Sequence, residues 1–365
     1  MSPLIARYFV PAAVFQGVIV GGGYGTGREV VEFVSRHGPG GGVIACAVIA
    51  AGFAAVLAVS FMLAVSYRVR DYRHFLKLLL GPAWVFYEAL FIALLVIVLA
   101  VVGSAAGEAL ADGFGLPYAP AVGVILGAVL VCNYFGRRLV ERALGTWTLL
   151  LMAGLAAFVV AVLSSPAHTV VVAAAPALPV LDAARSGLQF AVYNSALIPV
   201  LVYCVAHLER RRDALLAGIV AGFGGALPAL LLHLCFMSHT PAVLAEPIPT
   251  WWLLEAIGAQ AFLPLYFVLL AGTIVLTAVG VLQGVNERLD GWREDRGAAP
   301  LSRRTHALVA ASLVLVSLLL ARVGIIDLVA RGYGLLAWGF LAVFTVPLLT
   351  RGILLVHRQG VSHAP

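Results

Sequence analysis

Five glycines within seven residues form the segment of this chain best suited to bind a ligand. The segment Gly21-Gly22-Gly23-Tyr24-Gly25-Thr26-Gly27 follows an apolar stretch and precedes the charged segment Arg28-Glu29-Val30-Val31-Glu32-Phe33. Because this much glycine does not hold a regular helix, a break is expected here. A break frees backbone amides and carbonyls, and the half-helices on either side present dipole ends that suit a carboxylate or a cation.

Helix packing and phosphate binding, two common roles of glycine, fit this segment less well. Close helix packing needs a small residue at every fourth position, which is far less glycine than this segment holds. A phosphate-binding loop needs the pattern G-x-G-x-x-G or ends in Gly-Lys-Ser/Thr, whereas this segment continues as Gly27-Arg28-Glu29. We therefore interpret Gly21–Gly27 as a binding segment.

A second interruption is predicted in the apolar stretch around residues 185–206. Pro199 removes a backbone donor and disfavours helix just before it. An ordinary proline kink is the alternative. Aromatic rings near both interruptions, including that of Tyr24, could suit an aromatic or cationic ligand group. The candidate contacts in this second segment are Phe190, Tyr193, Asn194 and Ser195.

The chain that carries these segments has the composition of a membrane protein. Of its 365 residues, 62% are hydrophobic and 11% are charged, whereas soluble proteins carry about 25% charged residues. A membrane helix needs about 20 mostly apolar residues. Uninterrupted apolar runs without alternation predict helices and not barrel strands. The ten predicted spans are 8–36, 43–66, 83–111, 119–135, 143–163, 185–206, 213–236, 258–286, 304–321 and 324–350.

The positive charges indicate topology. The formal net charge is +6, but the Lys and Arg residues lie between apolar runs and build no continuous basic face, so a nucleic-acid partner is not expected. Most of them fall on one side of the predicted bundle, and the opposite loops at 164–184 and 237–257 contain none. Both termini are therefore predicted in the cytoplasm, with the chain embedded in the lipid bilayer of the cytoplasmic membrane.

The two interruptions fall in predicted spans one and six. These positions correspond if the ten spans form two inverted halves of five, and paired broken helices in inverted repeats are typical of secondary transporters. The fold class predicted is therefore an all-α integral membrane protein with a five-plus-five inverted repeat, in which helices one and six are discontinuous. Its predicted parts are a first repeat at 1–163, an outer linker at 164–184, a second repeat at 185–350 and a cytoplasmic tail at 351–365.

The stretch from Gly23 to Phe33 resembles the first-span motif of the YkvI-like family of bacterial membrane proteins. That family is placed among amino-acid permeases near the amino acid, polyamine and organocation superfamily, whose members share the LeuT-type fold. In that fold the substrate lies against the unwound parts of spans one and six. The resemblance therefore implies that Gly21–Gly27 and Tyr193–Ser195 contact a small zwitterionic solute.

Two kinds of coupling ion remain open. Sodium-coupled relatives hold the ion between span one and hydroxyls of span eight, where Thr273 and Thr277 lie four residues apart. The alternative is that each threonine bonds a carbonyl of its own helix. Proton coupling is the competitor, because a carboxylate buried among apolar groups takes up a proton more readily. Its candidates are Glu29, Glu32 and Glu108.

Arg28 and Asp327 are placed like the outer ion-pair gate of some LeuT-type transporters. The alternative pairs Arg28 with Glu32 and Asp327 with Arg331, each one helical turn away. The loop at 238–255 is predicted either to anchor tryptophans at the membrane interface or to cap a substrate entrance.

These features together predict a secondary-active transporter that moves an amino-acid-like solute by alternating access. No cofactor is expected beyond a possible sodium ion, and no nucleophile and base are spaced for an enzyme. A channel or a ligand-sensing receptor that uses the same cavity is the alternative function.

Overall fold

The structure is a computed structural model that describes residues 5–135, 137–166, 180–294 and 296–361. All regular elements within these ranges are helices. Most of the predicted linker 164–184 and the end of the predicted tail lie outside the described residues. Helix continues from the tenth predicted span to Val361.

The first half of the chain forms eight α-helices joined by short turns. They are α1 (Val10–Ile19), α2 (Gly22–Gly25), α3 (Arg28–Phe33), α4 (Gly38–Tyr67), α5 (Tyr72–Leu80), α6 (Trp84–Phe114), α7 (Tyr118–Phe135) and α8 (Arg137–Leu163), with η1 (Ile5–Phe9), η2 (Ser35–His37) and η3 (Gly81–Ala83).

The second half repeats this pattern of long and broken helices. Its helices are α9 (Val180–Ser195), α10 (Ile198–Leu201), α11 (Arg211–Met237), α12 (Ala242–Ala245), α13 (Pro249–Ala256), α14 (Leu263–Glu294), α15 (Arg303–Ala321), α16 (Ile325–Asp327), α17 (Gly334–Phe340) and α18 (Ile353–Val361), with η4 (Val202–Val205), η5 (Gln260–Phe262), η6 (Leu328–Tyr333), η7 (Leu341–Thr345) and η8 (Leu348–Gly352).

Six helical segments in the described residues are long and apolar enough to cross a membrane, and a bent pair makes a seventh. Two shorter apolar helices, Tyr118–Val131 and Leu149–Leu163, accompany them. Large apolar side chains such as Leu149 and Leu335 are about three-quarters exposed, as expected of a surface that faces lipid. The prediction of an all-α integral membrane protein is confirmed, whereas the number of ten spans stays a prediction.

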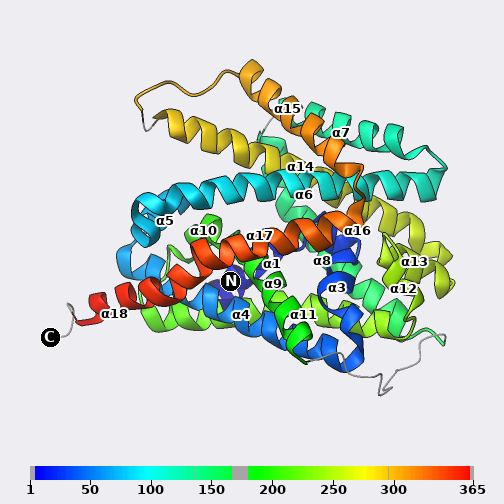
Figure 1. Ribbon diagram of the computed structural model, residues 1–365, viewed down its shortest axis with the longest axis horizontal. Coiled ribbons are helices and arrows are strands. Elements are labelled where there is room, and N and C mark those ends of the chain that lie inside the picture. Colours follow the sequence, from blue (N-terminus) through cyan, green and yellow to red (C-terminus); the bar gives the residue numbers. More distant parts are fainter. Residues whose placement is uncertain (1–4, 136, 167–179, 295, 362–365) are drawn as a thin grey trace.

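The helices gather into two groups that mix the halves of the chain (Figure 1). In one group α4 packs against α9 and α11, and α1 also packs against α11. In the other group α6 and α7 pack against α14 and α15. Gly218 and Gly222 allow the close contact of α11 with α4, since a Cβ on either would lie within 2.4 Å of backbone nitrogen. Each group thus contains two helices from each predicted half, and the two pairs stand at corresponding positions in their halves.

The first predicted break is present between α1 and α3. Helix α1 ends at Ile19, α2 is a single turn, and α3 starts after Gly27. Gly27 has a φ of 78°, which favours glycine, and a Cβ there would lie 2.6 Å from the ring of Phe236. Both the backbone conformation and the neighbouring ring therefore require glycine at this position.

The second predicted break bends the chain by 45° between α9 and the segment Ile198–Val205. Pro199 has no backbone N–H for the carbonyl of Ser195. The hydroxyl of Tyr87 donates to the neighbouring carbonyl of Ala196 at 2.5 Å. A side chain of α6 therefore satisfies a carbonyl beside the break, and helices one and six are both discontinuous as predicted.

Candidate functional site

A cavity of about 400 Å³ lies between the two interrupted helices, α6 and α14. This is a volume typical of small-molecule sites. The cavity opens between α1 and η4, where three of its wall residues, Val18, Val200 and Tyr203, are exposed. Most of the remaining wall is aliphatic, from Leu94, Leu95, Val98 and Val102 of α6, Leu197 and Leu201 beside the second break, and Leu276 and Val281 of α14.

Glu29 and two tyrosines form the polar part of the closed end. Glu29 is only 6% exposed, and its Oε2 accepts a hydrogen bond of 2.5 Å from the hydroxyl of Tyr193. The ring of Tyr193 stacks on that of Tyr333, with centroids 4.6 Å apart and an angle of 19° between the planes. All three residues line the cavity. Glu29 and Tyr193 were candidates from the sequence, whereas Tyr333 was not.

Arg288 lines another part of the cavity wall, toward the end of α14. Its Nε lies 3.3 Å from Oε2 of Glu88. The guanidinium stands over the rings of Tyr72 at 4.6 Å and Phe91 at 4.1 Å. From the sequence, Arg288 served only to assign the cytoplasmic side. Its position within the last turns of a long apolar helix is the sequence feature that could have marked it as a cavity residue.

Gly21 and Thr277 bring the end of α1 against α14. A Cβ on Gly21 would lie 3.4 Å from the hydroxyl oxygen of Thr277, and both residues line the cavity. The hydroxyl of Thr273 donates to the carbonyl of Leu269 at 2.7 Å and accepts from the indole of Trp147 at 3.0 Å. Of the two predicted sodium ligands, only Thr277 therefore faces the break.

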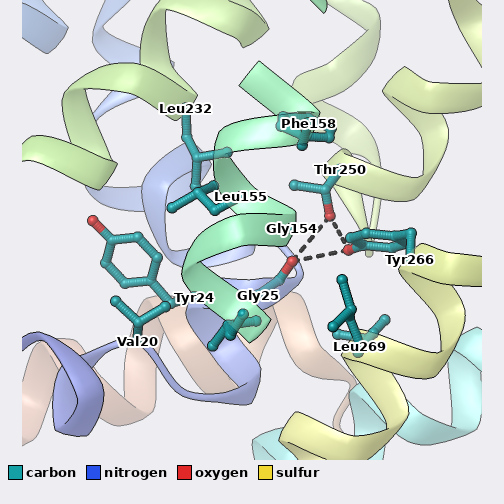
Figure 2. A pocket seen from close by; sticks show the side chains of 12 residues that line it. Val20, Tyr24, Gly25, Gly154, Leu155, Phe158, Leu232, Thr250, Tyr266 and Leu269 are labelled. Carbon is teal, nitrogen blue, oxygen red and sulfur yellow. Dashed lines mark hydrogen bonds between the residues drawn. The ribbon is translucent and has the colours of Figure 1, made fainter. Parts of the chain in front are cut away.

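The carbonyls of Gly25 and Thr26 in the glycine segment are bound outside this cavity. Figure 2 shows the carbonyl oxygen of Gly25 between the hydroxyls of Thr250 and Tyr266, at 3.1 and 2.9 Å. Thr250 also binds the carbonyl of Thr26 through its hydroxyl at 2.9 Å and its amide at 3.2 Å. A pocket of about 40 Å³ lies here, lined by Tyr24 and Gly25. The loop at 238–255 therefore covers the first break.

The predicted gate pair is not formed in the structure. Arg28 binds Glu32 at 3.1 Å and the backbone carbonyls of Leu244 and Glu246 at 2.8 and 3.1 Å. Asp327 pairs with Arg331 at 3.1 Å. Each of the two groups binds an oppositely charged neighbour one helical turn away, which is the alternative pairing given by the sequence. Arg28 is instead a tether between α3 and the covering loop.

The remaining candidates lie outside the described cavity wall, with one exception. Ser195 donates to the carbonyl of Ala191 at 2.6 Å, and Asn194, which does line the cavity, donates to Phe190 at 3.0 Å. The other candidates lie in or contact elements of the fold outside the cavity wall. Gly22 and Gly23 lie in α2, Phe190 is buried among the rings of Tyr24, Phe33, Phe53 and Tyr193, Glu32 binds Arg28 and Arg36, and Glu108 lies near Tyr118.

Structural comparison relates this arrangement to solved membrane proteins. A variant of the manganese transporter of Eremococcus coleocola superposes with a TM-score of 0.64 at 12% identity, over 97% of this chain and 84% of that chain. A second variant gives a TM-score of 0.57 at 14% identity over the same shares. The chain has a LeuT-type fold. At these identities the likeness concerns the LeuT-type fold alone.

Sequence comparison adds no family to this result. No protein-family profile matches the chain, and no curated protein sequence matches it. The resemblance to the YkvI-like family therefore stays an expectation from the sequence, whereas the fold that it implied is present.

Proposed function

We propose that this protein is a secondary-active transporter of a small amino-acid-like solute. The observation that carries the proposal is the cavity between the two broken helices. It reaches Glu29 and Tyr193 at its closed end and is open beside Val18 and Val200. A cavity open at one end and closed at the other is what alternating access requires of each end state.

The covering loop supports the same function. Arg28, Thr250 and Tyr266 tie the loop and the start of α14 to the first break through hydrogen bonds to backbone carbonyls. On the topology predicted from the Lys and Arg distribution, this loop lies outside and the cavity opens to the cytoplasm. We infer an inward-open transporter whose outer path is closed by the loop.

The wall of the cavity favours an organic solute over a metal ion. Manganese is bound by several carboxylate, carbonyl or water oxygens together. In the described part of the chain, no group of three His, Cys, Asp or Glu residues could hold a metal ion. Glu29 is the one acidic side chain on the described cavity wall. We therefore propose a different solute from that of the manganese transporter.

Two coupling cations fit different groups. Sodium would use Thr277 with carbonyls at the end of α1, and a proton would use Glu29.

Counterflow in proteoliposomes tests transport directly. Vesicles preloaded with unlabelled L-phenylalanine and diluted into labelled L-phenylalanine should accumulate label transiently and saturably, and protein-free vesicles should not. A panel of amino acids covers other side chains. Passive, unsaturable flux would identify a channel, and saturable binding without flux would identify a receptor; either result would overturn the proposal.

A further inference from the structure

Glu29 has no fixed positive partner in the described part of the chain. The only hydrogen bond of its carboxylate there comes from the neutral hydroxyl of Tyr193. The cations of the neighbouring turns are engaged elsewhere, since Arg28 and Arg36 both bind Glu32. A lone carboxylate at membrane depth is costly and needs either a proton or a cationic ligand.

The groups that face Glu29 from the surrounding helices are neutral phenols. They are Tyr193 from α9, whose hydroxyl donates to the carboxylate, and Tyr333 from η6, and both line the cavity with it. Of the titratable groups on other elements packed against α3, His37 of η2 is buried with neither ring nitrogen hydrogen-bonded within the described residues, and its acidic neighbours are Asp182 and Glu32. Asp327 of α16 pairs with Arg331, and His233 of α11 contacts Ser35 and the carbonyl of Pro39. A counter-charge for Glu29 must therefore enter through the cavity.

The rings beside Glu29 select the chemistry of that counter-charge. Tyr193 and Tyr333 stack directly beside the carboxylate and line the cavity with it. Tyrosine faces attract ammonium groups, and the carboxylate adds a charge-assisted hydrogen bond. A solute carboxylate at the same place would meet like charge. The closed end of the cavity therefore fits a protonated amine attached to an apolar or aromatic body, which the aliphatic wall of α6 would cover.

We propose that Glu29 is the recognition group for a protonated amine on the solute, and that a proton takes its place when the amine leaves. Amine and proton then exclude each other on one carboxylate, so the protein exchanges one for the other across the membrane. This inference rests on the proposed transport function and specifies both its substrate class and its coupling.

Three probes that share a phenyl ring and differ in charge test the recognition step. They are phenethylamine, L-phenylalanine and 3-phenylpropanoate, added to purified protein during thermal unfolding and in titration calorimetry. The two amines should raise the melting temperature with concentration, and the propanoate should not. E29Q should weaken amine binding by about tenfold or more, because a charge-assisted bond is lost. E255Q is the control, since it makes the same change at an exposed carboxylate of α13 that lies outside the cavity wall and accepts a hydrogen bond from Trp251.

The pH dependence tests the exclusion of amine by proton. Wild-type affinity for phenethylamine should fall as the pH is lowered through the titration of Glu29, and binding in weak buffer should release protons. E29D should keep this behaviour, which preserves the test if E29Q unfolds. Binding of propanoate as tight as that of the amines, binding of none of the amines, or pH-independent amine binding in wild type would each overturn the inference.

The failure of this inference is distinguishable from failure of the proposed function. Counterflow of L-phenylalanine that persists in E29Q overturns the amine site and leaves transport standing. Amine binding that depends on Glu29, without counterflow, overturns transport and leaves the amine site standing.

Discussion

The hydroxyl oxygen of Thr250 lies 3.1 Å from the carbonyl oxygen of Gly25, which is 225 positions earlier in the chain. A helix break exposes carbonyls that need new donors, and the covering loop provides one here. The same hydroxyl lies 2.9 Å from the carbonyl of Thr26. Opening of this side therefore requires these bonds to be exchanged for water or solute.

T250V should destabilise the closed loop. The substitution keeps the shape of the side chain but removes one of the two donors at the carbonyls of Gly25 and Thr26, while Tyr266 and the amide of residue 250 remain, so the loss should be about 0.5 to 1.5 kcal/mol. Thermal unfolding in detergent measures this loss. T350V is the matched control, because Thr350 is exposed and its hydroxyl bonds only carbonyls of its own helical turn. Equal losses in the two variants would contradict the role of Thr250.

G27A should destabilise the protein more than G258A. Both glycines have positive φ, at 78° and 73°, so alanine brings a strain of about 1 to 2 kcal/mol at either position. A Cβ on Gly258 meets open space, whereas one on Gly27 meets Phe236 and Thr250. The difference between the two melting temperatures isolates the contact at the break. Similar melting temperatures would show that the ring of Phe236 moves freely.

T273V and T277V should separate stability from binding. T273V removes the acceptor of the Trp147 indole and should lower the melting temperature while ligand binding stays unchanged. T277V changes the cavity wall and should weaken L-phenylalanine binding.

Replacement of sodium by potassium should leave wild-type binding unchanged if protons are exchanged at Glu29. A sodium requirement that disappears in T277V would instead assign the coupling ion to sodium.

R288K should loosen the open part of the cavity. Lysine keeps the charge but loses the planar contact with Tyr72 and Phe91, so the end of α14 is held less firmly. Labelling of a cysteine introduced at Val200 by an impermeant thiol reagent should become faster. R296K is the control, because Arg296 makes the same kind of contact with the half-exposed Trp292. Unchanged labelling in R288K would show that the contacts of Arg288 do not restrict access to the cavity.

Local features of the sequence determined the fold class and the two breaks. Apolar runs longer than a bilayer needs predict helices, because the backbone must satisfy its own hydrogen bonds in lipid. Five glycines in seven residues and the proline at 199 weaken helix wherever they stand. These effects act within a few residues, so no tertiary contact is needed to predict them.

Tertiary structure decided which residues of the breaks line the cavity. Gly21 and Glu29 face it, whereas the intervening Tyr24 and Gly25 face the covering loop and the smaller pocket. Helices that are apolar on every side carry no periodic pattern that distinguishes the cavity from lipid. Their rotation is set by packing between distant segments, as in the stacking of Tyr333 on Tyr193.

The partners of charged groups were likewise decided by distance in space. Arg28 reaches Glu32 and the covering loop, and Arg288 reaches Glu88 across two long helices. Sequence spacing identified the pairs one turn apart but not the pair between α6 and α14, because only the fold brings those side chains together. The physical reason is that a helix places its i,i+4 neighbours by local geometry, whereas contacts between helices depend on the whole packing arrangement.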